Sequence, residues 1–263
     1  MGEFTIGPCP EQGLTLPSKT SVADAMNRKG LHLVSDLYEA LALSHICLLV
    51  PKTYNEWLEQ FIEQKTVDEL YHTMHAKYIN KALRMSDIVL LNITNIIRDV
   101  LQGTKSRRKA RLHLLQLSEG LNENEATLID IICSCLQKLP NDYVANEIAE
   151  MELITMYLDP ILGPMFHQPS KARGFRWINQ MVGEHGAAPT NLRPDGIATL
   201  TPDHTHTFAL GFCEVKRKNA EKRPHDTQLD TFRIAMFCKD ALDKGEIKCT
   251  MGVQAVGMDF VSL

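Results

Sequence analysis

The sequence predicts a mixed α+β protein in which an all-helical N-terminal region precedes a domain with a mixed central β-sheet. From about residue 20 to 140, apolar residues recur at helical spacing and glycines are few. From about residue 141, runs rich in apolar and β-branched residues alternate with helical runs. The length of 263 residues allows one large domain or two modest ones. We therefore expect a flexible leader over 1–19, a helical region over 20–140 and an α+β domain over 141–263.

The helical region contains several signals that begin helices. The stretches 53–56 and 66–69 each place a glutamate three positions after a threonine, which is the pattern of a capping box. Ser86 and Asn122 can cap the two later helical runs, where apolar residues fall at helical spacing. We expect five to seven short-to-medium helices in this region.

The α+β domain has the order helix, three strands, helix, strand, strand. Its first helix is predicted over 142–166, where Pro160 and Pro164 imply a kink or an early end. Apolar and β-branched runs predict strands over 174–180, 195–201 and 207–216. A second helix and two closing strands around Gly257 are predicted over 226–244, 248–256 and 258–263.

Composition and charge limit the classes of function. The chain is 44% hydrophobic and 23% charged, which is typical of a globular protein with a sizeable core. A net charge of −4 excludes a global basic field, so a polyanion would have to bind at a local patch. The seven cysteines are odd in number and lie mostly in apolar runs, so we expect them to be reduced. With no secretory signal and no long apolar run, we expect an intracellular protein, nuclear or cytoplasmic, without a membrane partner.

The most informative motif is the triplet Glu214-Val215-Lys216, which follows Arg193-Pro194-Asp195 in the next predicted strand. Glu214 and Lys216 are two positions apart, so on a strand they point to the same face. Phosphodiester hydrolysis uses a divalent cation to shield the phosphate and to lower the pKa of an attacking water. Mg²⁺ prefers carboxylate oxygens, and a nearby lysine can stabilise developing charge. These groups in this order indicate a metal-dependent nuclease.

The ordered set resembles the PD-(D/E)xK nuclease superfamily over about residues 142–263, and the stretch 237–242 resembles a helix of uncharacterised fungal members. The resemblance implies a restriction-endonuclease-like core, helix-strand-strand-strand-helix-strand, with a mixed central sheet. It also implies that Glu150, Asp195, Glu214 and Lys216 meet at one end of that sheet. Asp195 and Glu214 would then hold Mg²⁺ or Mn²⁺, Glu150 would support the metal or its water, and Lys216 would assist the attacking water.

The acidic residue of the first helix has three candidates, Glu147, Glu150 and Glu152. Position before the stretch 157–162 favours Glu150, whereas Glu147 lies nearer the apolar stripe of the helix. We adopt Glu150 and keep Glu147 as the alternative.

A basic run beside the proposed site predicts contact with nucleic acid, with DNA as the expected substrate. Lys218, Lys222 and Arg223 would contact phosphates without reading sequence, and Gln228 could orient a phosphate or water. Their alternative role is that of a solvated loop and helix start. A second cluster over 105–111 resembles a nuclear localisation or nucleic-acid patch, but the polar face of a helix start is the preferred interpretation. His204 and His206 are predicted to lie in an exposed hairpin rather than to bind metal.

A second hypothesis comes from a different class of protein. The chain could be a catalytically inactive nuclease-like fold that serves as an interaction module for protein or nucleic acid. Its helical region would then be the surface for a protein partner or for a homodimer. The acidic net charge favours this alternative.

Overall fold

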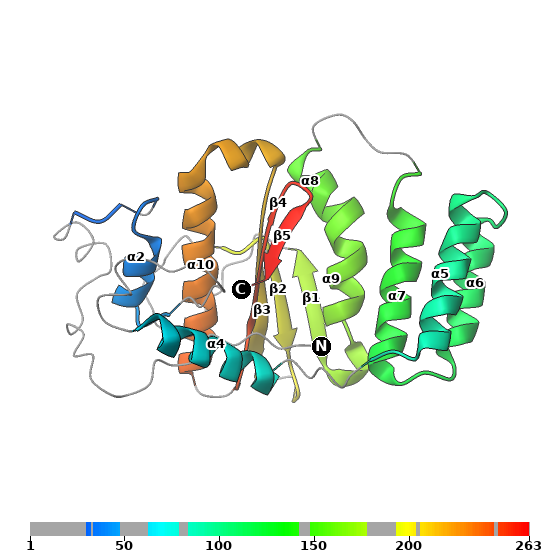
Figure 1. Ribbon diagram of the computed structural model, residues 1–263, viewed down its shortest axis with the longest axis horizontal. Coiled ribbons are helices and arrows are strands. Elements are labelled where there is room, and N and C mark those ends of the chain that lie inside the picture. The colour runs from blue at the N-terminus through cyan, green and yellow to red at the C-terminus, as the bar shows by residue number, and fades with distance from the viewer. Residues whose placement is uncertain are drawn as a thin grey trace.

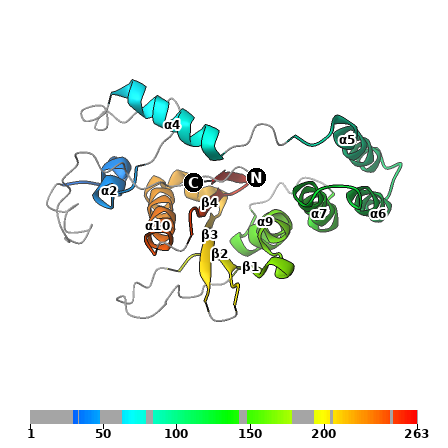
Figure 2. The same ribbon diagram turned by 90° about the horizontal axis from the view of Figure 1, so that it is seen from below.

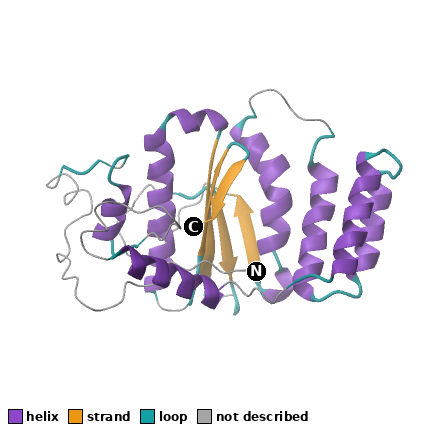
Figure 3. Ribbon diagram, in the orientation of Figure 1, coloured by secondary structure: helices purple, strands orange, loops and turns teal. Residues whose placement is uncertain are grey.

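The computed structural model describes residues 30–32, 34–47, 63–78, 84–141, 148–177, 193–203, 206–244 and 247–262. These residues form a mixed α+β fold, which confirms the predicted class. Figure 3 shows the strands as one layer between helices. The predicted leader over 1–19, the capping box at 53–56, Glu147 and His204 lie outside the described residues. No described helix is long and apolar enough to cross a membrane.

The described part of the N-terminal region is helical, with α2 (Leu37–Leu43), α4 (Gln64–Tyr78), α5 (Asp87–Leu101), α6 (Arg107–Ser118) and α7 (Glu123–Lys138). The start of α7 is as predicted, because Asn122 and Glu125 form a capping box. Ser86 precedes α5, although its side chain makes no capping hydrogen bond. The capping box predicted at 66–69 is wrong, because α4 has already begun at Gln64.

Helices α5, α6 and α7 form a bundle that packs beside the sheet domain (Figure 1). Its core contains Ile93, Leu114, Ile129 and Cys133, contributed by all three helices. Helix α7 packs against α9 (Asp159–Phe166), where Lys138 forms an ion pair with Asp159. The bundle is therefore joined to the sheet domain by both apolar packing and an ion pair.

The first helix of the α+β domain is interrupted. Its described part runs from α8 (Glu150–Glu152) through the π-helical segment η1 (Leu153–Leu158) to α9. Pro160 lies in the first turn of α9 and Pro164 lies inside it. A proline ring removes one backbone donor and crowds the preceding turn, so the change of helical pitch before Pro160 has a local cause. The predicted irregularity is confirmed, although it begins before the prolines.

One five-stranded sheet in the order β1-β2-β3-β4-β5 forms the centre of the described domain. Its strands are β1 (Arg173–Trp177), β2 (Gly196–Leu200), β3 (Phe208–Lys216), β4 (Met251–Val256) and β5 (Asp259–Ser262). Strands β1, β2 and β3 pair antiparallel, β3 and β4 pair parallel, and β4 and β5 pair antiparallel. The parallel pair requires a crossover, which is made by α10 (Pro224–Asp243). Each strand overlaps its predicted range.

The two faces of the sheet bury different helices. Cys213 and Val215 pack against η1 and α9 on one face, whereas Phe212 packs against α10 on the other. Figure 2 shows α9 and α10 on opposite sides of the strands, with α7, α6 and α5 beyond α9. Because β3 alternates its side chains, Glu214 and Lys216 must lie on the α10 side.

Helix α2 covers the outer side of α10. Leu41 and Ile46 form a small core with Ala235, and Phe232 and Met236 pack against it. The N-terminal region therefore contacts the sheet domain on both of its sides, through α2 at α10 and through α7 at α9.

Candidate active site

Strand pairing places Asp195 beside the end of β3. Gly196 pairs with Cys213, so the preceding residue, Asp195, lies next to Glu214. The Oδ2 atom of Asp195 accepts a hydrogen bond from the backbone N–H of Val215 at 2.7 Å. A Cβ atom at Gly196 would lie 3.1 Å from the Trp177 ring, so glycine permits this close packing of the strands. The Asp195 carboxylate is thus fixed by the backbone of the triplet itself.

Glu214 is the most deeply buried member of the predicted set, with 3% of its side chain exposed. Its Oε1 atom is buried and has no hydrogen-bond partner. Burial, followed by the charges of Asp195 and Asp230, raises the pKa of Glu214 to about 8. The charged form of Glu214 is therefore disfavoured, first by burial and then by the two neighbouring carboxylates.

Lys216 lies on the same face as Glu214, as the two-residue spacing predicted. Its Nζ atom is 3.2 Å from Asp230 Oδ2 and 3.9 Å from Glu214 Oε2. Burial opposes the charged amine, but Asp230, Asp195 and Glu214 outweigh it and raise the pKa of Lys216. Lys216 is therefore a cation held among three carboxylates.

The sequence analysis did not assign a role to Asp230, which closes the site from α10. Its side chain is 1% exposed and lies between Lys216 and Arg233, whose Nη1 atom is 3.2 Å from Oδ1. Burial raises the pKa of Asp230, although Lys216 and Arg233 oppose that shift. A signal was available, because Asp230 precedes the buried Ile234 by one helical turn. An acid on the buried stripe of an amphipathic helix requires a cation from a neighbouring element.

Hydrogen bonds between uncharged groups hold α10 against the sheet next to the site. Gln254 on β4 pairs with Glu214 in the strand register. Its Nε2 atom donates to the carbonyl of Thr227 at 2.6 Å, and its Oε1 atom accepts from Thr231 at 2.9 Å. These bonds hold the first half of α10, and with it Asp230, against the end of the sheet.

The predicted nucleic-acid contacts lie on the segment that leaves β3. Lys218 and Lys222 are exposed at the two ends of the 3₁₀ segment η3 (Lys218–Lys222), and Arg223 follows it. Arg223 is also paired with Asp226 at 3.0 Å. Gln228 is half-buried on α10, and its Oε1 atom has no hydrogen-bond partner. These exposed cations follow directly on the strand that carries Glu214 and Lys216, and their contact with nucleic acid stays a prediction.

Glu150 is the first residue of α8, in the helix layer that covers the opposite face of the sheet. Figure 1 places α8 and η3 at the same end of the sheet, uppermost in that view. Within the residues described, no group of three or more His, Cys, Asp or Glu side chains is arranged to hold a metal ion. The structure therefore brings together Asp195, Glu214, Lys216 and Asp230, and it places Glu150 at the same end of the sheet without joining it to them.

The basic cluster over 105–111 and His206 both form contacts within the chain. In the basic cluster, Lys105 pairs with Asp99 at 3.0 Å. Arg107 donates to the carbonyls of Leu136 and Pro140 at the end of α7, at 3.3 and 3.1 Å. His206 is exposed and pairs with Asp203, which agrees with a connecting turn.

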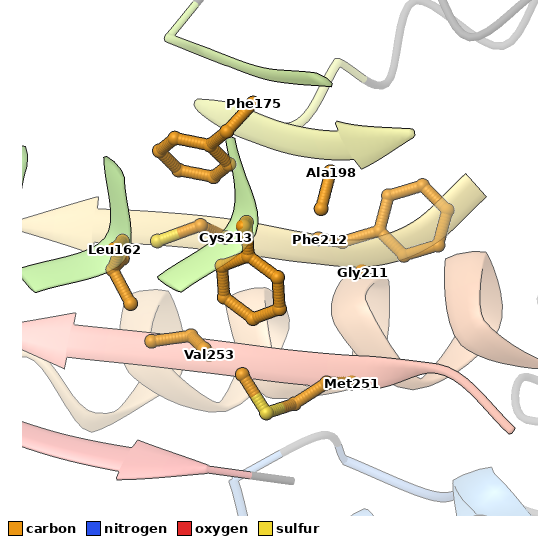
Figure 4. Close-up of a pocket in the computed structure, with 9 residues that line it drawn as sticks. Leu162, Phe175, Ala198, Gly211, Phe212, Cys213, Met251 and Val253 are labelled. Carbon is orange, nitrogen blue, oxygen red and sulfur yellow. The ribbon is translucent and has the colours of Figure 1, made fainter. Parts of the chain in front are cut away.

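An apolar cavity lies between the sheet and α9, apart from the carboxylates (Figure 4). Its lining is Leu162, Phe166, Phe175, Ala198, Gly211, Phe212, Cys213, Met251 and Val253. A Cβ atom at Gly211 would lie 2.8 Å from the Met251 carbonyl oxygen, so β3 and β4 approach closely there. The cavity offers no charged or polar side chain, and we assign it to core packing.

The carboxylates and cations of this site can neutralise and orient charge at the end of the sheet. Asp195 is fixed by a backbone hydrogen bond, Glu214 presents a carboxyl oxygen without a partner, and Lys216 supplies a positive charge. No family model matches the chain, and comparison with curated proteins and with solved structures found no match.

Proposed function

We propose that this protein is a metal-dependent nuclease that hydrolyses phosphodiester bonds in DNA. The observation that carries the proposal is the convergence of Asp195, Glu214 and Lys216 at one end of β2 and β3. Glu214 and Lys216 lie on β3, and Asp195 immediately precedes β2, which pairs with β3, so the paired strands set their arrangement. The resemblance of their order to the PD-(D/E)xK superfamily supports the same function.

The side chains fit a hard divalent cation such as Mg²⁺ or Mn²⁺. Both prefer oxygen ligands, and Glu214 has a buried oxygen that lacks any partner. Burial, followed by the charges of Asp195 and Asp230, raises the pKa of Glu214, and a bound cation would favour its charged form. Asp195 and Glu214 would hold the cation, and Glu150 would support it or its water. When bound, the cation would shield the phosphate and lower the pKa of a bound water.

Lys216 acts as a cation and hydrogen-bond donor rather than as a base. Its pKa is raised by the surrounding carboxylates, so the amine keeps its proton at neutral pH. A fixed ammonium group can orient the attacking water or stabilise the charge that develops on the phosphate. Asp230, 3.2 Å away, holds the amine in place.

The basic segment after β3 supplies the substrate contacts. Lys218, Lys222 and Arg223 are exposed beside the site, where they would bind backbone phosphates of the DNA. Gln228 would use its half-buried amide to orient a phosphate or a water. Such contacts make affinity fall steeply with salt without selecting a sequence.

The direct test is cleavage of plasmid and oligonucleotide DNA in the presence of Mg²⁺ or Mn²⁺. Wild type would be compared with Glu214→Gln, Lys216→Ala and the control Lys248→Ala, whose side chain is exposed and lies outside the site. We expect both site variants to lose about 100-fold or more in rate, whereas the control keeps its activity. Equal cleavage by all four preparations would identify a contaminant and overturn the proposal.

A second candidate function is a nuclease-like fold that binds partners without cutting. The observation that favours it is the position of Lys216, which is closer to Asp230 than to Glu214. A lysine with its own buried partner can serve as a structural ion pair. In this reading the helical region would bind a protein, and the basic segment would bind nucleic acid without hydrolysis.

Metal titration separates the two candidates. A cation that binds only the folded protein stabilises it, by about 2.7 kcal/mol at 100 times its dissociation constant. For a nuclease we expect Mn²⁺ to raise the Tm of wild type and to leave that of Asp195→Asn unchanged. No rise in either protein, together with no cleavage, would instead support the interaction module.

A further inference from the structure

The outer helices of the bundle expose large aliphatic side chains to solvent in addition to those that they bury in the core. Ile93 of α5 and Leu114 of α6 are buried between the helices. Large aliphatic side chains are nevertheless exposed on the same two helices, namely Ile88 (72%), Leu90 (44%), Leu91 (58%) and Leu101 (83%) of α5, and Leu112 (56%) and Leu115 (44%) of α6. We call these six side chains the outer surface. Clusters of exposed aliphatic side chains mark surfaces that bind a partner, so the outer surface indicates one.

The two ends of the α5–α6 pair carry opposite charge. The helices are joined by the short connection 102–106 and lie side by side, so the end of α5 is next to the start of α6 (Figure 1). Exposed cations gather at that end, namely Arg98, Arg108 and Lys109. The opposite end carries exposed Asp87 and Glu119, whose charge Arg84 offsets in part.

Two other cations at the basic end form contacts within the chain. Lys105 is paired with Asp99, and the Arg107 guanidinium binds carbonyls at the end of α7. Arg108 and Lys109 follow Arg107 in the sequence and are exposed to solvent. The outer surface therefore lies between a basic end and an acidic end of the α5–α6 pair.

We propose that the outer surface pairs with the same surface of a second copy of this chain, antiparallel and across a twofold axis. A twofold contact uses one patch on both copies, so that patch must be complementary to itself. In the antiparallel arrangement the basic end of each copy lies on the acidic end of the other, and the aliphatic side chains meet between them. A parallel arrangement would place like charges together, which opposes association. This inference is independent of the proposed nuclease activity.

The oligomeric state of the full-length chain provides the first test. We expect the mass measured by sedimentation or light scattering to rise with concentration from that of one chain to that of two. The double variant Leu91→Glu with Leu112→Glu should remain a monomer, whereas the control Val34→Glu should dimerise like wild type, because Val34 is exposed outside the outer surface. A monomeric wild type, a dimeric double variant or an open series of larger assemblies would overturn the proposal.

A charge-reversal experiment tests the antiparallel arrangement itself. One variant carries Asp87→Lys and Glu119→Lys, and a second carries Arg98→Glu, Arg108→Glu and Lys109→Glu. Each should be folded by circular dichroism and monomeric alone, because both ends of its outer surface then have the same sign. An equimolar mixture should form a heterodimer, since every contact again joins opposite charges. Folded variants that fail to associate when mixed would contradict the arrangement, and misfolding alone cannot produce the rescue.

Discussion

At Glu214, burial and two neighbouring carboxylates raise the pKa of the side chain to about 8, whereas an unfolded glutamate titrates near 4.5. Between these values the folded protein holds a proton that the unfolded chain has released. Stability is then greatest below pH 4.5 as far as this residue contributes, and it falls as pH rises to about 8. At neutral pH, the buried carboxyl group of Glu214 therefore lowers the stability of the folded protein.

Replacing Glu214 with glutamine should remove this pH dependence. The amide stays neutral, so we expect Glu214→Gln to be more stable than wild type by about 2–3 kcal/mol at pH 8.5 and nearly equal to it at pH 5. Urea unfolding at both pH values measures the difference. A difference in the free energy of unfolding that is the same at pH 5 and pH 8.5 would show that the carboxyl group titrates normally.

Asp230 should matter more for stability than a neighbouring acid of the same helix. Asp230→Ala removes the buried partner of Lys216 and Arg233, so we expect a loss of about 2 kcal/mol, moderated by the partial exposure of both cations. Asp226→Ala is the matched control, because that acid is paired with Arg223 at the surface and should change stability by less than about 0.5 kcal/mol. Chemical denaturation of both variants gives the comparison, and equal losses would contradict the proposed role of Asp230.

At the scale of elements, the end of α7 depends on a side chain from α6. The last carbonyls of a helix have no partner within the helix, and the Arg107 guanidinium binds those of Leu136, Leu139 and Pro140. The segment before α8 begins directly after this point. The guanidinium therefore joins the start of α6 to the end of α7 and to the two residues that follow it.

We expect Arg107→Ala to lower the free energy of unfolding by about 1–3 kcal/mol, because it leaves those carbonyls without their charged donor. Arg108→Ala, next to it but exposed, should have almost no effect. Thermal unfolding of the two single variants is the measurement. If both variants lose the same stability, the loss comes from the charge of the cluster rather than from the hydrogen bonds of Arg107.

At the scale of the whole molecule, the helical bundle and the sheet share contacts that should make them unfold together. Asp159 forms an ion pair with Lys138 of the bundle and accepts a hydrogen bond from the Trp177 indole of β1 at 2.9 Å. Gln168 likewise donates to Thr127 of α7 at 3.3 Å. These bonds accompany the apolar packing of α7 on α9.

A cavity that destabilises the bundle should therefore also lower the stability of the sheet. Leu114 is fully buried among α5, α6 and α7, so Leu114→Ala should cost about 2–5 kcal/mol. In a Trp57→Phe background, the fluorescence of Trp177 reports on β1 alone. We expect its unfolding midpoint to fall together with the helical signal in circular dichroism. A fluorescence midpoint that stays in place would show that the two parts unfold separately.

Local patterns were sufficient for the elements and for half of the site. Periodicity located α7, β3 and α10, because each has a continuous apolar stripe, and the spacing of Glu214 and Lys216 required a shared face. Asp230 was not assigned because its partner is distant in sequence, and only the packing of α10 on β3 shows that they meet. The separation of Glu150 from the other carboxylates follows from helix packing, which periodicity does not specify.

The π-helical segment η1 sets the rotation of α8, which carries Glu150, relative to α9. Successive residues of an α-helix are rotated by about 100°, and a π turn accommodates one residue more than an α turn. Deleting one residue there, such as the exposed Thr155, would restore a regular α-helix while Leu158 and Leu162 stayed in their places against the sheet. The preceding turn would then swing around the axis and carry the Glu150 carboxylate to another side. The π turn thus sets the angle between the part of the helix that packs on the sheet through Leu158 and Leu162 and the turn that begins at Glu150.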